Sequence, residues 1–219
     1  MAKGFFIAIE GPDGCGKSTQ INYLAENLKS LGYDVVLTRE PGGTKLGEEV
    51  RKLLLLSKEG NVSPYAELLL FEAARAQHVE EVLKPALEDG KIVIASRYAD
   101  ATRAYQGGGR RLPMAEVKRA NALGTRGLWP DLTIIIDIDS EEGLRRVKGC
   151  AEGAPGKDLP SGKLDRIESA GLEFHKRVRA EYLVLAKRES DRICLVDGRL
   201  KKEEIAEIIK KLVLERLNA

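Results

Sequence analysis

The sequence predicts an α/β fold, a three-layer sandwich in which a five-stranded parallel sheet is flanked by helices on both faces. Two observations predict it: short apolar runs alternate with segments of helical period along the chain, and a glycine-rich loop follows the first run. No Pro- or Ser-rich linker divides the 219 residues. We therefore expect a single domain over residues 1–219, with a lid segment at about 148–166.

Five apolar runs are expected to form the strands. Strands of a parallel sheet are covered on both faces, so they are apolar throughout rather than at alternate positions. The expected strands are Phe5–Glu10, Asp34–Thr38, Lys91–Ser96, Leu132–Asp137 and Arg192–Val196.

Seven segments between and after these runs have the periodicity of a helix with one buried face. Helices of this kind connect successive parallel strands and cover the sheet. The expected helices are Lys17–Leu31, Lys45–Leu56, Pro64–Glu88, Met114–Leu123, Glu141–Val147, Leu164–Glu189 and Lys202–Leu217.

Composition excludes several classes of protein. With 43% hydrophobic and 32% charged residues the chain has the composition of an ordinary globular protein, and its net charge of +2 gives no case for a nucleic-acid or membrane surface. It has no apolar run long enough to cross a membrane and no signal-peptide core before Phe5, so we expect a cytoplasmic location. The three cysteines, Cys15, Cys150 and Cys194, lack metal-ligand spacing and are expected to be reduced thiols.

The loop between Gly11 and Ser18 carries the strongest functional signal. It fits the pattern G-x-x-x-x-G-K-[ST], and it lies between a predicted strand and a predicted helix, as a phosphate-binding loop must. Its backbone N–H groups can surround a phosphate, Lys17 adds a cation, and the Ser18 hydroxyl can reach Mg²⁺. The fold is therefore expected to be of the P-loop NTPase type, and the ATP-binding residues to be Gly11, Pro12, Asp13, Gly14, Cys15, Gly16, Lys17, Ser18 and Thr19.

Further polar residues follow the other strands, where ligands of open α/β sheets bind. They are Arg39–Gly43, the pair Arg97-Tyr98, and Asp137–Ser140. The Gly- and Pro-rich segment Gly149–Lys163 has no helical period and is interpreted as a flap that brings flanking cations over the phosphate loop.

Such a site suits phosphoryl transfer between two phosphates, which needs cations, a metal ion and exclusion of water. An acceptor phosphate, with a second pKa of about 6, is already ionised at neutral pH and needs no general base. His78 and His175, the two histidines, are accordingly expected to lie on helix surfaces rather than to act in catalysis.

Several stretches together resemble the thymidylate (dTMP) kinase family of the nucleoside monophosphate kinase group. The resemblance spans nearly the whole chain. It is carried by Ile9–Gly14, Thr38–Thr44, Leu70–Gln77, Arg97-Tyr98, Ala104–Gly109, Pro130–Thr133 and Leu164–Glu168.

The resemblance implies an enzyme that uses ATP and Mg²⁺ to convert dTMP to dTDP, and a homodimer formed through the helices that begin at Pro64 and Met114. It also implies small-molecule partners, ATP and dTMP, rather than nucleic acid. Two alternatives remain: a non-catalytic nucleotide-binding or regulatory module of the same fold, and a kinase for another nucleoside or deoxynucleoside monophosphate.

The resemblance assigns the acceptor nucleotide to a further set of residues. Arg39 and Arg97 match clamps on the acceptor phosphate, and Phe71 matches the ring that stacks on thymine. Arg75 matches a donor to a thymine carbonyl; because a guanidinium can only donate, it would disfavour the amino group of cytosine. Tyr105 and Gln106 match positions beside the deoxyribose and the base.

Other matched residues concern the metal, the adenine and the lid. Asp13 matches a carboxylate near the sugar 3′-hydroxyl or the metal, and Arg145 matches a position against adenine. The phosphate loop has no arginine. In family members with such a loop the lid supplies charge to the transferring phosphate, so the resemblance implies that lid cations do so here; the candidates are Lys148, Lys157, Lys163 and Arg166, with Lys163 and Arg166 preferred. The expected catalytic residues are thus Lys17, Arg39, Arg97, Lys163 and Arg166, and the expected metal site comprises Ser18, Asp13 and Glu168.

Two positions depart from the family pattern. Ser96 stands where an Asp usually precedes the Arg-Tyr pair, and Ala101 stands where a Ser is usual. Loss of the carboxylate removes support for Mg²⁺, so slower chemistry or looser metal binding is expected. Asp13, Glu10 or Glu168 could compensate, or the Ser96 hydroxyl could hold a metal-bound water.

Overall fold

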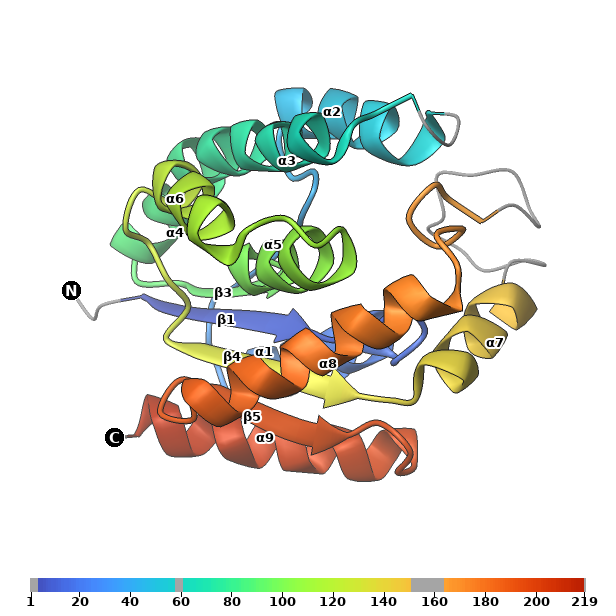
Figure 1. Ribbon diagram of the computed structural model, residues 1–219. Coiled ribbons are helices and arrows are strands. Elements are labelled where there is room, and N and C mark those ends of the chain that lie inside the picture. The colour runs from blue at the N-terminus through green and yellow to red at the C-terminus, as the bar shows by residue number, and fades with distance from the viewer. Residues whose placement is uncertain (1–3, 58–60, 151–163, 219) are drawn as a thin grey trace.

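A computed structural model describes residues 4–57, 61–150 and 164–218. Five parallel strands form one sheet in the order β2-β3-β1-β4-β5 (Figure 1), which confirms the expected α/β fold. Each strand agrees with its predicted range to within a residue at either end. The strands are β1 (Phe5–Glu10), β2 (Val35–Arg39), β3 (Ile92–Ser96), β4 (Leu132–Asp137) and β5 (Ile193–Asp197).

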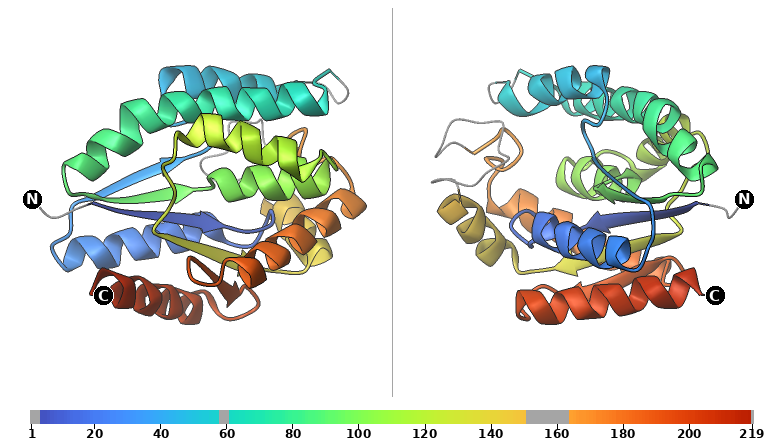
Figure 2. Two further views of the ribbon diagram at one scale, coloured as in Figure 1. Left: turned by 60° about the vertical axis from the view of Figure 1, so that its left-hand side comes forward. Right: turned by 180° about the vertical axis from the view of Figure 1, so that it is seen from behind.

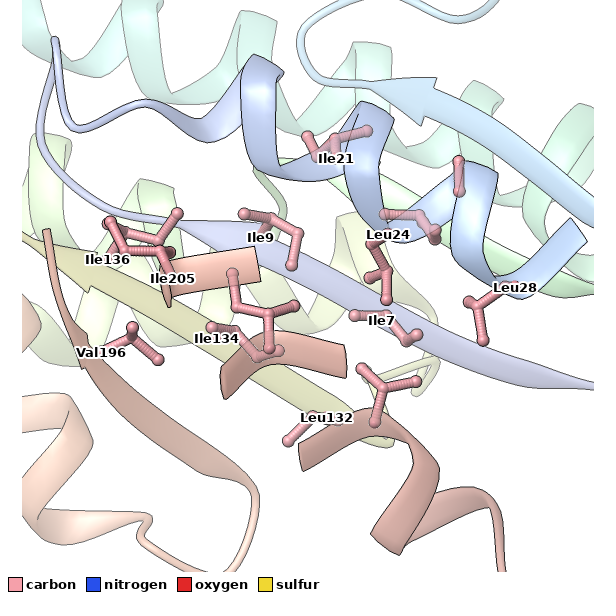
Figure 3. Packing of buried hydrophobic residues seen from close by; sticks show 14 of the residues in the cluster. Ile7, Ile9, Ile21, Leu24, Leu28, Leu132, Ile134, Ile136, Val196 and Ile205 are labelled. Carbon is pink, nitrogen blue, oxygen red and sulfur yellow. The ribbon is translucent and has the colours of Figure 1, made fainter. Parts of the chain in front are cut away.

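Helices α1 (Lys17–Ser30) and α9 (Lys202–Leu217) cover one face of the sheet (Figure 2). Alternate residues of β1 point to this layer, where Ile7 and Ile9 pack with Leu24 of α1 (Figure 3). The residues between them, such as Phe6, point to the opposite layer. Both sets are fully buried, which explains why β1 is apolar at every position up to Glu10.

The opposite face carries the remaining large helices. These helices pack against the sheet in two apolar clusters, one around Phe6 and Val93 and another around Ile135 and Tyr182. The helical segments outside the first layer are α2 (Lys45–Leu56), α3 (Pro64–His78), η1 (Val79–Leu83), α4 (Lys84–Glu88), α5 (Ala99–Thr102), η2 (Arg103–Gly109), α6 (Met114–Thr125), α7 (Ser140–Cys150) and α8 (Leu172–Arg188).

The predicted helix Pro64–Glu88 is present but contains a wider turn. Its five residues Val79–Leu83 are π-helical and separate α3 from α4. Pro85 lies directly after this turn and has no N–H with which to continue the α-helical ladder. The wider turn accommodates the proline without ending the helix.

One helix was not predicted, and another begins later than predicted. The segment Ala99–Gly109 is helical although its three glycines at 107–109 are typical of a loop; a Cβ at Gly109 would lie 2.5 Å from Cε2 of Phe174, so close packing against α8 requires glycine there. The helix expected from Leu164 begins only at Leu172, after Gly171 at φ +83°. Before it, Asp165 Oδ1 accepts from the N–H groups of Ile167 and Glu168 and forms a turn.

The strand register brings the predicted site residues to one edge. Ser96 pairs with Ile9 of β1 and with Arg39 of β2, so the carboxyl ends of three strands lie side by side. Of the lid expected at 148–166, residues 151–163 lie outside the described residues, and Lys157 and Lys163 with them. No helix in the described ranges is both long and apolar enough to span a bilayer.

Candidate active site

A cavity of about 780 Å³ lies beyond the carboxyl ends of the strands. Its lining includes three groups of residues: the phosphate loop from Asp13 to Thr19, a set from α3 and the helix after β3, and a set from α7 and the start of α9. The second set includes Phe71, Arg75, Thr102, Tyr105 and Gln106, and the third includes Arg146, Val147, Leu200, Lys202 and Ile205.

The phosphate loop has the geometry of an anion site. Gly11, Gly14 and Gly16 have φ values of +136°, +77° and +96°, which L-residues with a side chain rarely adopt. A Cβ at Gly14 would lie 2.1 Å from the carbonyl oxygen of Gly143, whereas one at Gly16 would meet nothing within 4 Å. Gly16 begins α1 without a side-chain cap, so the first N–H groups of the helix can receive a phosphate.

Lys17 and Ser18 complete the fit to ATP and Mg²⁺. Lys17 Nζ donates to the carbonyl oxygens of Gly11 and Pro12 at 3.0 and 2.9 Å, which folds the side chain over the loop. Ser18 is exposed and lines the cavity. Among the described residues, no group of three or more His, Cys, Asp or Glu side chains could hold a metal ion.

Arg97 lies between the phosphate loop and the helix after β3. Its backbone has φ +71°, a strained value for a residue other than glycine, and such strain clusters at functional sites. The guanidinium donates to the Gly11 carbonyl at 3.3 Å and pairs with Asp13, and it lies 4.6 Å from the centre of the Tyr105 ring. The side chain is only 18% exposed, so its charge acts in a largely water-excluded place.

Asp13 connects this arginine to Tyr105 and His175 on the cavity wall. Its Oδ2 accepts from the Tyr105 hydroxyl at 2.9 Å and lies 3.8 Å from Nδ1 of His175. Burial tends to raise the pKa of Asp13, but the charges of Arg97, Lys17 and His175 outweigh burial and hold this pKa below its ordinary value. Asp13 is therefore an anion facing the cavity, with Glu168 further along its wall.

Arg75 anchors the pocket next to Phe71. It is 1% exposed, and its Nε donates to Glu40 at 2.8 Å while its Nη2 donates to Thr102 at 2.9 Å. Its Nη1 donates to Glu72 and Asn121. Carboxylates on two sides hold the guanidinium in one place, and four of its five N–H groups donate to partners among the described residues, which leaves one N–H on Nη2 as a donor.

Five predicted site residues within the described ranges lie outside the cavity lining: Gly11 and Pro12 of the phosphate loop, and Arg39, Arg145 and Arg166. Gly11 and Pro12 accept from Lys17 Nζ through their carbonyl oxygens. Arg39 pairs with Glu48 at 3.1 Å, and Arg145 is 78% exposed and pairs with Glu142. Arg166 is buried, where its Nη2 lies 2.6 Å from Glu67 and its Nε donates to the Leu54 carbonyl. Their roles stay predictions.

Arg146, expected only as one of the cations that flank the flap, lines the cavity next to Val147 and donates to the Gly198 carbonyl. Arg145 and Arg146 both pair with Glu142, at three and four residues' distance, so helical spacing alone does not distinguish them.

The expectation that both histidines lie on helix surfaces was wrong. His78 is fully buried between Glu40 and Thr38, at 2.9 and 2.6 Å, and His175 is 2% exposed. Each has a polar partner, and this interaction offsets the free-energy cost of burying an imidazole.

The position of Glu10 does not support the suggestion that this residue compensates for the carboxylate missing at position 96. Glu10 is fully buried, and its carboxylate accepts from the N–H groups of Tyr98 and Ala101 and from the Tyr182 hydroxyl. Asp13 and Glu168 line the cavity, whereas Glu10 does not.

Known proteins share this architecture and sequence. The family model for thymidylate kinase matches residues 9–209. A thymidylate kinase of Pelobacter propionicus is 48% identical over 98% of this chain and 96% of its own length, and one of Halothermothrix orenii is 47% identical over 93% of each chain. The crystal structure of thymidylate kinase from Ehrlichia chaffeensis has a TM-score of 0.74 at 34% identity and covers 96% of this chain and 99% of that one. The chain, with its phosphate loop and acceptor pocket in one cavity, therefore belongs to the thymidylate kinase family.

Proposed function

We propose that the cavity binds MgATP and dTMP together and transfers the γ-phosphoryl group, giving ADP and dTDP. One observation carries this proposal: a phosphate loop and a pocket for a planar base line the same cavity, with Arg97 between them. Family membership favours the same reaction.

On the donor side, the phosphate loop and Lys17 would hold the β- and γ-phosphates. Ser18 would hold Mg²⁺, with Asp13 and Glu168 in its surroundings, and the metal would neutralise charge on the phosphates when bound. Arg146, Leu200 and Ile205 would form the walls of the adenine site, which suits a flat aromatic base.

On the acceptor side, Arg97 would exchange its contact with Asp13 for the phosphate of dTMP. Phe71 would stack on thymine, and Arg75 would donate to its 4-carbonyl oxygen. Tyr105, held by Asp13, would crowd a ribose 2′-hydroxyl. Since the acceptor phosphate is already ionised, no residue needs to remove a proton.

Arg39, Arg145 and Arg166 would act only after leaving their present carboxylate partners, so their contribution depends on rearrangement when nucleotides bind. Lys163, outside the described residues, keeps its proposed role toward the transferring phosphate.

A coupled ADP-release assay with product analysis tests the proposal. Purified protein with ATP and Mg²⁺ is offered dTMP, dUMP, dCMP, dGMP and UMP in parallel. We expect dTDP and ADP in equal amounts and a clear preference for dTMP. A stronger turnover of dCMP or dGMP would indicate a different acceptor, and binding of both nucleotides without product would indicate a non-catalytic module.

We further propose a homodimer, supported by apolar side chains on the outer side of the helical layer. Leu53 of α2, Leu69 of α3 and Leu123 of α6 are 56%, 61% and 77% exposed, and α3 packs against α6. Sedimentation of the protein and of a Leu69→Lys variant checks this: a dimer that the variant converts to a monomer is expected. The reaction's need for cellular ATP and dTMP supports a cytoplasmic location.

A further inference from the structure

Glu67 is a fully buried carboxylate that lies behind the base pocket. It comes from the first turn of α3, and its Oε1 accepts from Gln106 Nε2 at 2.8 Å and from Arg110 Nε at 3.1 Å. Its Oε2 accepts from Arg110 Nη2 at 3.0 Å and lies 2.6 Å from Arg166 Nη2. None of the site roles described above uses this residue.

The carboxylate is ionised at neutral pH. Burial tends to raise the pKa of Glu67, but hydrogen bonds from Arg110 and Gln106 and the charges of Arg110 and Arg166 outweigh burial and bring it below its ordinary value. An ionised carboxylate can accept hydrogen bonds but cannot donate one.

This restriction fixes the orientation of the Gln106 amide. A glutamine presents either its NH₂ group or its oxygen to a neighbour, and only the NH₂ group can bond to Glu67. Gln106 lines the cavity, and its Oε1 has no hydrogen-bond partner within the part of the chain that the structure describes. The free oxygen is therefore available to a ligand as an acceptor, in the cavity that Arg75 also lines.

We propose that Glu67 is a positioning residue for base selection, which holds Gln106 so that its oxygen, and not its NH₂ group, meets the base. Thymine and uracil carry an N3–H donor next to the 4-carbonyl acceptor, and these complement Gln106 Oε1 and Arg75. Cytosine carries an N3 lone pair next to a 4-amino donor. Its N3 acceptor would face the acceptor oxygen of Gln106, and its amino donor would face the donor group of Arg75. Sites that leave buried polar groups unpaired reject the wrong ligand strongly.

The inference rests on the proposed dTMP kinase activity and adds a cause for its specificity. A merely structural Glu67, which neutralises Arg110 and Arg166, would affect all substrates alike when it is changed. A positioning Glu67 would change the ratio of kcat/KM between dTMP and dCMP. That ratio is the measurement that distinguishes the two.

The first test is Glu67→Gln. Its amide can donate to Gln106, which allows Gln106 to turn its NH₂ group toward the cavity. The ratio of kcat/KM for dTMP over dCMP is expected to fall by about tenfold or more, because dCMP gains a partner and dTMP loses one. Glu67→Asp keeps the negative charge beside Arg110 and Arg166, so it provides a second test if Glu67→Gln does not fold. Its shorter side chain should hold Gln106 less firmly and lower the ratio in the same direction.

Two further variants show whether Glu67 acts through Gln106. Gln106→Met removes the amide, and in that background Glu67→Gln should leave the ratio unchanged. Glu189→Gln serves as the matched control, because Glu189 also lies between two arginines, Arg103 and Arg192, each at 2.6 Å, but does not line the cavity. It should lower stability and leave the ratio as in the wild type.

An unchanged ratio in folded Glu67→Gln and Glu67→Asp, with normal dTMP turnover by the wild type, would overturn the inference and leave the proposed function intact. A wild-type protein that does not phosphorylate dTMP would instead contradict the proposed function. In that case the ratio of dissociation constants for dTMP and dCMP, measured by calorimetry on the same variants, tests the role of Glu67 by the same outcomes.

Discussion

The titration of Glu10, at the end of β1, is expected to make the stability of the protein depend on pH. Replacement of Glu10 by Gln is expected to remove this dependence. The carboxyl of Glu10 is fully buried, and burial, partly offset by the charge of Arg97, raises its pKa from 4.5 to about 7. Glutamine has the same shape, and its oxygen can still accept from the N–H groups of Tyr98 and Ala101.

The magnitude follows from linkage. Between the unfolded value of 4.5 and the folded value of about 7, the folded protein holds a proton that the unfolded chain has lost, so stability falls as pH rises through this window. At about 1.4 kcal/mol for each unit of pKa, the full effect is about 3 kcal/mol. Of this, about 2.5 kcal/mol falls between about pH 5 and about pH 8.

Urea unfolding of the wild type and of Glu10→Gln at a series of pH values measures this effect. All other titrating groups are shared, so the difference in unfolding free energy between the two proteins isolates Glu10. The wild type should lose about 2.5 kcal/mol relative to the variant from about pH 5 to about pH 8. A difference that is constant across this range would refute the reasoning.

Three further changes test the site. Arg97→Ala should lower kcat by about 10²- to 10³-fold and leave ATP affinity within about twofold, since Arg97 serves the acceptor phosphate; an equal loss of ATP binding, by calorimetry, would contradict this. Gly14→Ala would place a Cβ 2.1 Å from the Gly143 carbonyl oxygen, so ATP affinity should fall by about tenfold or more, and unchanged affinity would show that the loop can yield. Ser96→Asp should lower the Mg²⁺ concentration needed for half-maximal activity; no change in a Mg²⁺ titration would show that another group already serves.

The fold could be predicted well because its three central strands, β1, β3 and β4, are buried on both faces and the two edge strands are still apolar runs. All five apolar runs became strands, and the phosphate loop lies where its motif placed it. Local pattern failed where tertiary packing decides: Gly108 and Gly109 lie in a helix that packs closely against α8, and Gly171 delays the start of α8. The sequence near these residues does not indicate which distant helix will pack against them.

The grouping of Phe71, Arg75, Tyr105 and Gln106 was also predictable, since they line one cavity; their contacts with a base stay predictions. The positions of long charged side chains were not, because ion pairs formed in three dimensions decide where they point. Glu67, which contacts Gln106 from behind, carries no motif of its own, and only the structure brings it next to the amide that it orients.

A crystal structure with dTMP, ADP and Mg²⁺ bound tests the central claim most directly. The account predicts that the pyrimidine ring stacks on Phe71 with its N3 edge toward Gln106 Oε1, and that its phosphate lies beside Arg97 and faces the loop that holds ADP. A pyrimidine bound away from Phe71, with its phosphate directed away from Lys17, would contradict it.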